Sequence, residues 1–178
     1  MKVIAFTGMP GSGKSEAVKI AKKLGVNVIR MGDCVWDEVE KRGLKINDEN
    51  VGRVADEMRK KHGMDIWARR TLEKIDRSQD KIVIDGIRSI EEMDFFRKNL
   101  GKDFLLVAIH ASPETRYKRL LERKRDDDTL SVEKVKERDA RELRWGLGIL
   151  IALADVIIIN EGSLEEFKTK VRELLTNF

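Results

Sequence analysis

Short, continuous apolar segments alternate along the chain with longer segments in which apolar residues recur every three or four positions. The continuous segments cover residues 3–7, 26–29, 82–84, 104–109 and 156–159. Runs of this length are typical of strands buried on both faces, and the longer period is typical of helices. Strands that alternate with helices indicate a parallel sheet covered by helices. The pattern therefore predicts an α/β fold with a five-stranded parallel sheet.

Several helix starts are marked by capping residues. Residues 89–92 and 163–166 each begin with serine and end with glutamate, which is the spacing of a capping box. Pro113 stands at the expected first position of another helix, where its missing N–H costs nothing. The helical period also covers residues 15–24, most of residues 33–77, and residues 131–145.

Length and composition disfavour several classes of protein. The 178 residues are enough for one compact domain. The 36 lysines and arginines are interleaved with 32 aspartates and glutamates, which disfavours a basic stripe that binds nucleic acid. The longest apolar run, residues 147–154, is too short to span a membrane. A glycine-rich motif follows the start almost directly, so we expect no signal peptide.

The single cysteine, Cys34, cannot form an internal disulfide, so we expect a reducing compartment, the cytoplasm. One cysteine and two histidines disfavour a zinc site and a Cys–His nucleophile. Any metal should be a hard ion held by oxygen atoms, such as Mg²⁺.

The most specific motif follows the first predicted strand. It matches the P-loop pattern Gly-x4-Gly-Lys-Ser/Thr with Gly8, Met9, Pro10, Gly11, Ser12, Gly13, Lys14 and Ser15. Its glycines let successive N–H groups point at one anion, and the helix N-terminus adds partial positive charge. The motif predicts an ATP-binding site in which Lys14 contacts the β- and γ-phosphates and Ser15 binds Mg²⁺.

Two aspartates follow predicted strands. Asp85 ends the third strand and should lie beside the P-loop, where an acid can hold Mg²⁺ in the Walker-B role. Asp33 follows the second strand and Gly32, at the edge where open α/β sheets bind ligands. Asp33 is a candidate catalytic residue that orients a hydroxyl acceptor or takes its proton. Its structural alternative is to cap the following helix.

Two predicted helices carry arginines on either side of a polar break at residues 126–129. Arg119 and Arg123 are four residues apart and share a face, and Arg138 and Arg141 follow on the next helix. Such a pair of helices could close over a triphosphate and neutralise charge in the transition state. We assign Arg119 and Arg123 to ATP binding, and Arg123, Arg138 and Arg141 to catalysis. The alternative is a solvated face stabilised by salt bridges.

Further candidates lie between these motifs. Arg53, Arg59 and Arg88 could bind phosphate on the acceptor, or could pair with acids on the surface. The chain has three tryptophans, which are more often core residues than partners for base stacking. These are Trp36, Trp67 and Trp145.

Together these residues resemble the nucleotide-kinase branch of P-loop proteins, which includes adenylate kinase and dephospho-CoA kinase. The resemblance is most specific to a group of poorly characterised archaeal proteins related to both enzymes. Gly32-Asp33 resembles the start of the acceptor-binding region of adenylate kinases, and residues 85–88 resemble their Asp-Gly-x-x-Arg, shortened by one residue. Residues 119–123 resemble the Arg-x3-Arg at the lid, and residues 154–163 a stretch near the adenine site of dephospho-CoA kinases.

The resemblance implies a nucleoside-monophosphate-kinase-like fold in one P-loop kinase domain over residues 1–178. It implies a core of residues 1–30 and 78–178, a helical acceptor-binding insert at about residues 31–77, and a short lid at about residues 123–142. It also implies transfer of the γ-phosphoryl group of ATP to a nucleotide-like small molecule, with Mg²⁺. Three residues after Asp33, where adenylate kinases carry arginine, this chain has Trp36.

Several functions remain open at this point. The acceptor could be a nucleoside monophosphate such as AMP, or a ribose hydroxyl as in dephospho-CoA kinase. An ATP-binding protein or ATPase without kinase turnover, and a P-loop protein that acts on nucleic acid, are further alternatives. The chain lacks the Asn-Lys-x-Asp motif with which GTPases read guanine.

Overall fold

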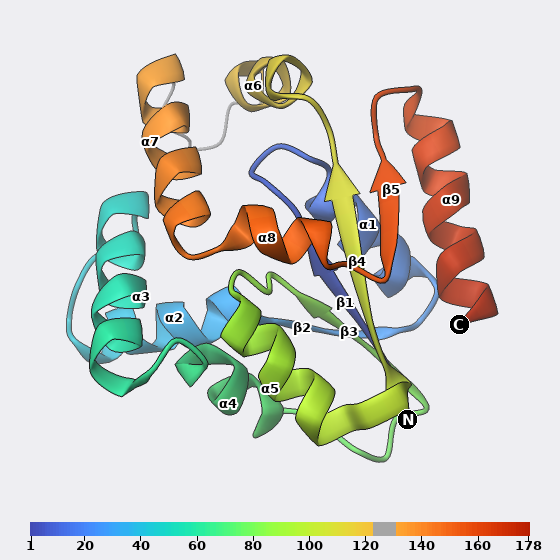
Figure 1. Cartoon of the computed structure of the whole chain (residues 1–178), viewed down its shortest axis with the longest axis horizontal. Helices are drawn as coiled ribbons and strands as arrows, with labels where there is room; N and C mark the ends of the chain where they lie inside the picture. Colours follow the sequence, from blue (N-terminus) through green and yellow to red (C-terminus); the bar gives the residue numbers. More distant parts are fainter. Residues whose placement is uncertain (123–130) are drawn as a thin grey trace.

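The computed structural model describes residues 1–122 and 131–178, and its centre is a five-stranded sheet (Figure 1). The strands are β1 (Lys2–Thr7), β2 (Asn27–Arg30), β3 (Lys81–Asp85), β4 (Phe104–His110) and β5 (Val156–Ile159). Their order is β2-β3-β1-β4-β5, and every neighbouring pair is parallel. This confirms the predicted α/β fold.

Helices fill the connections between the strands. They are α1 (Lys14–Lys23), α2 (Met31–Lys41), α3 (Asp48–His62), α4 (Ile66–Leu72), α5 (Ile90–Leu100), α6 (Pro113–Glu122), α7 (Val132–Arg144), α8 (Leu147–Ala152) and α9 (Leu164–Asn177), with a 3-10 turn at Gly101–Asp103. Both predicted capping boxes are present, because Ser89 and Ser163 each accept the N–H of the glutamate three residues later. Among the described residues, no helix is long and apolar enough to cross a membrane.

One local expectation was wrong, and one alternative is excluded. The second strand runs one residue later than predicted, and α2 starts directly after it at Met31. The residue that precedes α2 is therefore Arg30, and Asp33 lies within the first turn instead of capping the helix. The apolar run at residues 147–154, for which no helix or strand was predicted, contains a short helix, α8.

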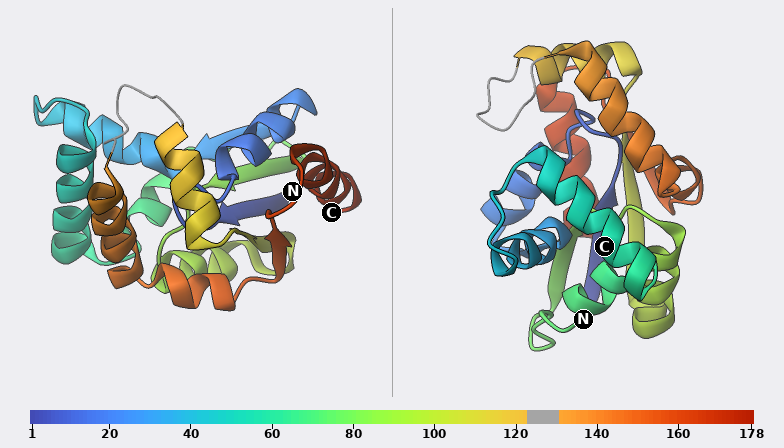
Figure 2. Two further views of the ribbon diagram at one scale, coloured as in Figure 1. Left: turned by 90° about the horizontal axis from the view of Figure 1, so that it is seen from above. Right: turned by 90° about the vertical axis from the view of Figure 1, so that its left-hand side faces the viewer.

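Alternate residues of each central strand face two separate apolar layers. Along β1, Val3 and Ala5 pack into one core cluster, and Ile4 and Phe6 into the other. The first cluster joins the sheet to α2, α3, α4, α5 and α8, and the second joins it to α1 and α9 (Figure 2). The continuous apolar runs therefore reflect burial on both faces, as predicted.

The two edge strands depart from this pattern. In β2, the terminal residues Asn27 and Arg30 are exposed. In β5, Ile157 and Ile159 are 49% and 48% exposed. Burial on both faces thus holds for the three central strands only.

A buried ion pair fastens α3 to α5. Arg59 Nη2 lies 2.8 Å from Glu92 Oε1, and the two side chains are 4% and 0% exposed. Glu92 also accepts the backbone N–H of Arg88 at 2.7 Å, so one carboxylate serves both contacts. The Arg59 guanidinium lies 4.3 Å from the ring centroid of Trp145.

We predict that Arg59→Met lowers the free energy of unfolding by about 3 kcal/mol, because it leaves the Glu92 carboxylate buried without its charge partner. Urea denaturation followed by circular dichroism measures the loss. The matched control is Arg53→Met on the same helix, where Arg53 is 53% exposed and its ion pair with Glu57 spans 3.9 Å; this change should cost less than about 1 kcal/mol. Equal losses in the two variants would contradict the prediction.

Candidate functional site

The P-loop joins β1 to α1 at the carboxyl end of the sheet. Gly8, Gly11 and Gly13 have φ angles of 147°, 79° and 115°, which side-chain-bearing residues rarely adopt. A Cβ atom at Gly11 would lie 2.7 Å from the carbonyl oxygen of Arg116, and one at Gly13 would collide with the Asn160 amide. Conformation and close packing therefore both require these glycines, and they leave the N–H groups at the start of α1 available to an anion.

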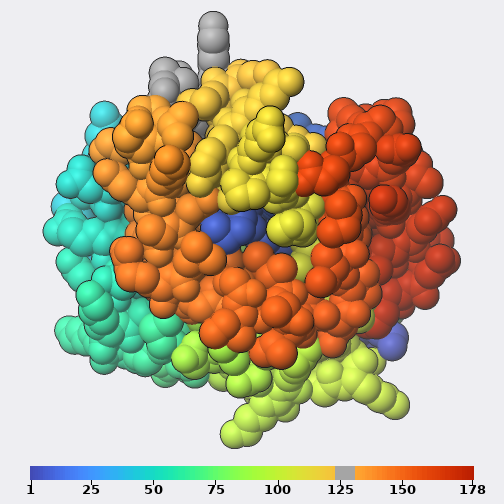
Figure 3. All heavy atoms as spheres, turned by 45° about the horizontal axis from the view of Figure 1, so that its top comes forward, coloured from blue at the N-terminus to red at the C-terminus, as the bar shows by residue number. Residues whose placement is uncertain are grey.

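Two buried side chains from distant segments hold the loop in place. Asn160 donates its side-chain amide to the carbonyl of Ser12 at 2.8 Å, and Arg116 donates to the carbonyl of Pro10 at 2.9 Å. Arg116 also forms a buried ion pair of 2.7 Å with Asp139. Behind the loop, a hollow between α6, α7 and α8 reaches down to Met9 (Figure 3). Sequence reasoning missed both supports, although Asn160 lay within the stretch that resembled dephospho-CoA kinases.

Lys14 folds back over the loop. Its ammonium donates to the carbonyl oxygens of Gly8 and, at 3.3 Å, Met9. Burial, followed by the nearby charge of Arg88, lowers the pKa of Lys14 to about 8. No carboxylate among the described residues lies within ion-pair distance of this ammonium. The site therefore presents a lysine whose charge an incoming anion would stabilise.

Asp85 lies beside the P-loop strand, as expected. In the register of β3 and β1 it is the partner of Phe6, two residues before Gly8. Its Oδ2 atom lies 4.0 Å from Arg30 Nε, and its Oδ1 atom is buried without a hydrogen-bond partner in the described structure. Asp85 and Ser15 line the same cleft. No cluster of three or more acidic, histidine or cysteine side chains that could hold a metal occurs among the described residues.

The cleft has a volume of about 410 Å³ and lies between the P-loop, α2, α3, α6 and α7. Among the described residues, three carboxylates line it, those of Glu16, Asp48 and Asp85. Six cationic side chains line it, those of Lys14, Lys19, Arg30, Arg88, Arg119 and Arg138. This excess of positive charge favours a polyanionic ligand.

Arg88 and Arg138 reach the cleft with a shared buried acid behind them. Glu142 is 2% exposed, pairs with Arg88, and lies 3.3 Å from Arg138 Nε. Burial alone would raise the pKa of Glu142, but the charges of Arg88 and Arg138 outweigh it and hold the pKa below its ordinary value. The carboxylate thus stays ionised and holds together two arginines from different elements, the segment after β3 and α7. The salt-bridge alternative for these arginines assumed a solvated face, whereas this pairing acid is buried.

Arg141 does not line the cleft itself. Its Nη2 atom is 3.0 Å and 3.3 Å from the two carboxylate oxygens of Asp48, at the start of α3. Arg138 Nε lies 3.9 Å from the same carboxylate. Asp48 therefore joins α3 to α7, a connection that the sequence pattern did not indicate. Of the other arginines at the lid, Arg119 lines the cleft and donates to the carbonyl of Asn160 at 2.9 Å, and Arg123 lies outside the described residues.

Three predicted acceptor-site residues do not line the cleft in this structure. Asp33 is 47% exposed and lies 3.5 Å from Arg30 Nη1. Arg53 contacts Asn50 at 3.1 Å on the exposed side of α3. Arg59 is held in the buried pair with Glu92 and lies outside the cleft lining.

The tryptophans occupy different environments. Trp67 is 1% exposed and belongs to the core, as expected. Trp145 is partly buried and donates to Asp56 at 3.3 Å. Trp36 lines the cleft, and the Arg30 guanidinium lies 5.2 Å from its ring centroid. A planar, partly apolar wall therefore adjoins the cationic cleft.

Comparisons with known proteins identify the family and the fold of this chain. A family model described as an AAA domain matches residues 7–136. A UPF0200 protein of Methanosarcina barkeri is 48% identical over 179 residues, covering 100% of this chain and 96% of the relative. A UPF0200 protein of Thermoplasma volcanium is 50% identical over 173 residues, covering 97% and 96%.

Two solved kinases have the same fold at low sequence identity. Shikimate kinase from Acinetobacter baumannii is 18% identical with a TM-score of 0.60, covering 99% of this chain and 94% of the kinase. A gluconokinase from Sinorhizobium meliloti is 17% identical with a TM-score of 0.59, covering 99% and 92%. The chain therefore belongs to the archaeal UPF0200 family, and its AAA domain has the fold of the P-loop kinases.

Proposed function

We propose that this protein is an ATP-dependent kinase that transfers the γ-phosphoryl group to a nucleoside monophosphate or a similar small acceptor. The observation that carries the proposal is the meeting of a complete P-loop, Lys14 and Asp85 with Arg88 and Arg138 in one cationic cleft. The kinases that share the fold support phosphoryl transfer as the reaction type.

The donor side of the cleft suits a triphosphate. The N–H groups of the loop and the amino end of α1 would accept its oxygen atoms. Lys14 would turn from the loop carbonyls to the β- and γ-phosphates, and Arg119 approaches from α6. In the transfer, an acceptor oxygen bonds to the γ-phosphorus as the bond from that phosphorus to the bridging oxygen breaks. Positioning and charge neutralisation supply most of the catalysis.

The site also fits a magnesium ion. The buried Oδ1 atom of Asp85 lacks a hydrogen-bond partner among the described residues, and Ser15 lines the same cleft. Both present hard oxygen ligands, and Mg²⁺ commonly takes few protein ligands beside phosphate and water. Bound there, the ion would neutralise phosphate charge.

The acceptor side suits an anion that carries a ring. Arg30 and Arg88 approach from β2 and from the end of β3, while Trp36 forms the apolar wall. An acceptor that is already ionised requires no general base. The position of Asp33, half-exposed beside Arg30 and away from the cleft lining, supports a phosphate acceptor over a ribose hydroxyl.

We predict that Lys14→Ala lowers the rate of phosphoryl transfer by about 10²-fold or more, because it removes a charge aimed at the transferred group. The measurement is ATP consumption over a panel of nucleoside monophosphates and dephospho-CoA. The matched control is Lys22→Ala on the exposed side of the same helix, which should keep the activity. Activity that survives in Lys14→Ala, or ATP loss without a phosphorylated product, would contradict the kinase proposal.

We predict that Asp33→Asn lowers kcat by less than about tenfold with a nucleoside monophosphate, because that acceptor needs no proton removed. If the acceptor is instead a ribose hydroxyl and Asp33 is its base, the loss should be about 10² to 10⁴-fold. Steady-state kinetics with the acceptor found in the panel separates the two cases.

We predict that the protein takes up a proton near pH 8 when it binds a nucleoside triphosphate with magnesium. Lys14 has a pKa of about 8 in the ligand-free protein, and the added phosphate charge raises it. Affinity should therefore fall as the pH rises through 8, because binding above that value must first protonate the amine. Calorimetry in two buffers of different ionisation enthalpy measures the uptake, which should vanish in Lys14→Met. An uptake of equal size in that variant would assign the proton to another group.

A further inference from the structure

One edge of the sheet is apolar and unprotected. Strand β5 pairs with β4 alone among the described residues, and its sequence, Val-Ile-Ile-Ile, contains no charge or proline. Ile157 and Ile159 are 49% and 48% exposed, and on α8 Leu153 and Ile149 are 47% and 57% exposed. Proteins normally blunt such an edge with charges, proline or a covering segment, because its free N–H and C=O groups invite another strand.

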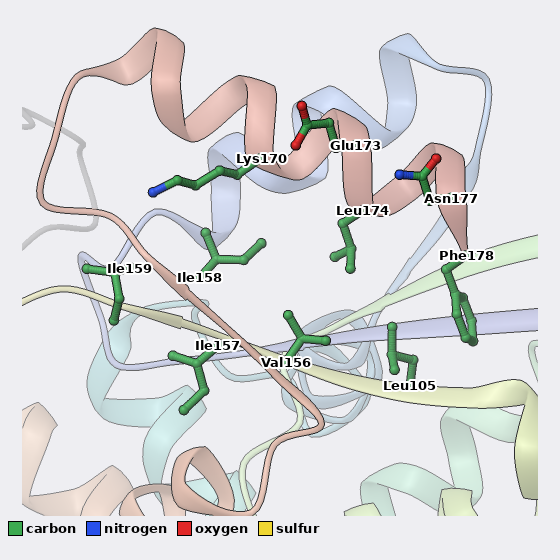
Figure 4. Close-up of a pocket in the computed structure, with 10 residues that line it drawn as sticks. All are labelled: Leu105, Val156, Ile157, Ile158, Ile159, Lys170, Glu173, Leu174, Asn177 and Phe178. Atoms are coloured by element: carbon green, nitrogen blue, oxygen red, sulfur yellow. The ribbon is translucent and has the colours of Figure 1, made fainter.

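A groove of about 630 Å³ runs along this edge between β5 and α9 (Figure 4). Its apolar floor includes Val156, Ile158 and Leu174, and two charged residues of α9, Lys170 and Glu173, border it. Neither forms an ion pair with another described residue. Protein interfaces commonly have an apolar centre and a polar rim, and this groove has both: apolar side chains at its base and, at its border, one cation and one anion that are unpaired among the described residues.

The backbone of β5 defines how a second strand would add. Asn160 donates its N–H to the carbonyl of His110 in β4. This bond follows the register in which His110 pairs with Ile159, whereas the Asp155 N–H, which donates to Leu106 before the strand begins, is out of that register. Because the direction of these groups alternates along a strand, Ile157 and Ile159 turn their N–H and C=O groups to the free edge. An antiparallel strand centred on Ile158 would meet both residues with complete pairs of hydrogen bonds.

We propose that this chain forms a two-fold symmetric dimer in which β5 pairs antiparallel with β5 of a second copy. The two sheets then become one, with Ile157 beside Ile159 of the second copy and Ile158 beside its own counterpart. Residues paired in this way lie on the same face of the sheet, so the exposed isoleucines cover each other. A two-fold axis is the symmetry that lets one strand edge complement itself.

The charges beside the groove favour a second copy over an unrelated partner. In Figure 4 the Lys170 side chain extends toward the Ile159 end of β5, and Glu173 lies nearer to Val156. The two-fold axis reverses these ends, so Lys170 of each copy faces Glu173 of the other. The two-fold axis therefore brings the cation of one copy to the anion of the other in both directions. A surface with this property is complementary to itself.

The dimer leaves the P-loop cleft open. No residue of β5 or α9 lines that cleft, which lies toward the β2 side of the sheet. Failure of the dimer proposal and failure of the kinase proposal are therefore separate outcomes.

Sedimentation velocity of the full chain at micromolar concentrations tests the proposal. The wild type should sediment as a dimer, and Ile157→Lys should sediment as a monomer, because it places two charges against the paired edge. The matched control is Leu24→Lys, which changes an equally exposed residue, 47%, after α1 and should stay dimeric. Circular dichroism and urea unfolding confirm that each variant is folded. A monomeric wild type, or a dimer that persists in folded Ile157→Lys, would overturn the proposal.

Charge reversal supplies a second test that keeps the apolar surface intact. Lys170→Glu replaces two attractions by two repulsions across the axis and should raise the dimer dissociation constant about tenfold. The double variant Lys170→Glu with Glu173→Lys restores opposite charges and should recover most of the lost affinity. A double variant that associates no better than the single variant would show that these residues do not face each other, against the proposed axis.

Discussion

The central constraint on the cleft is a partly buried lysine ammonium that has no carboxylate partner among the described residues. Lys14 is held by loop carbonyls, and its pKa is lowered to about 8 by burial and by Arg88. Carbonyl dipoles compensate the charge less well than an anion would. The protein thus bears an electrostatic cost at this point. A bound phosphate would relieve that cost and would couple ligand binding to the protonation of Lys14.

The acids near the cleft act chiefly on the arginines. Glu142 is shared between Arg88 and Arg138, and Asp48 holds Arg141 across the gap between α3 and α7. Each carboxylate fixes a long, flexible side chain before a ligand arrives, so less rotational freedom is lost on binding. Glu142 is almost fully buried, and its ion pairs are to two arginines that line the cleft. Its contribution is to the position and charge of the groups that line the cleft.

Much of this arrangement could be predicted from the sequence because it depends on local pattern. The strands, both capping boxes, the P-loop and the place of Asp85 follow from periodicity and from motifs that specify one local geometry. The partners of the arginines could not be predicted in this way. Arg59 and Glu92 are 33 residues apart, and Arg141 and Asp48 are 93 apart. A charged residue on a helix has the same sequence pattern whether it meets water, a buried acid or a ligand, and only the packing of the helices decides.

The same reasoning explains why the two edges of the sheet differ. Strand β2 exposes Asn27 and Arg30 at its ends, and Arg30 contacts Asp33 and Asp85 near the cleft. Polar groups there discourage a further strand and also serve the site. Strand β5 is just as short, yet it exposes isoleucines, and it stands two places from β1 in the strand order. If a ligand binds near the β2 edge and a second copy pairs with the β5 edge, the two edges need different residues. Arg30 beside the cleft and the exposed Ile157 on β5 show that difference.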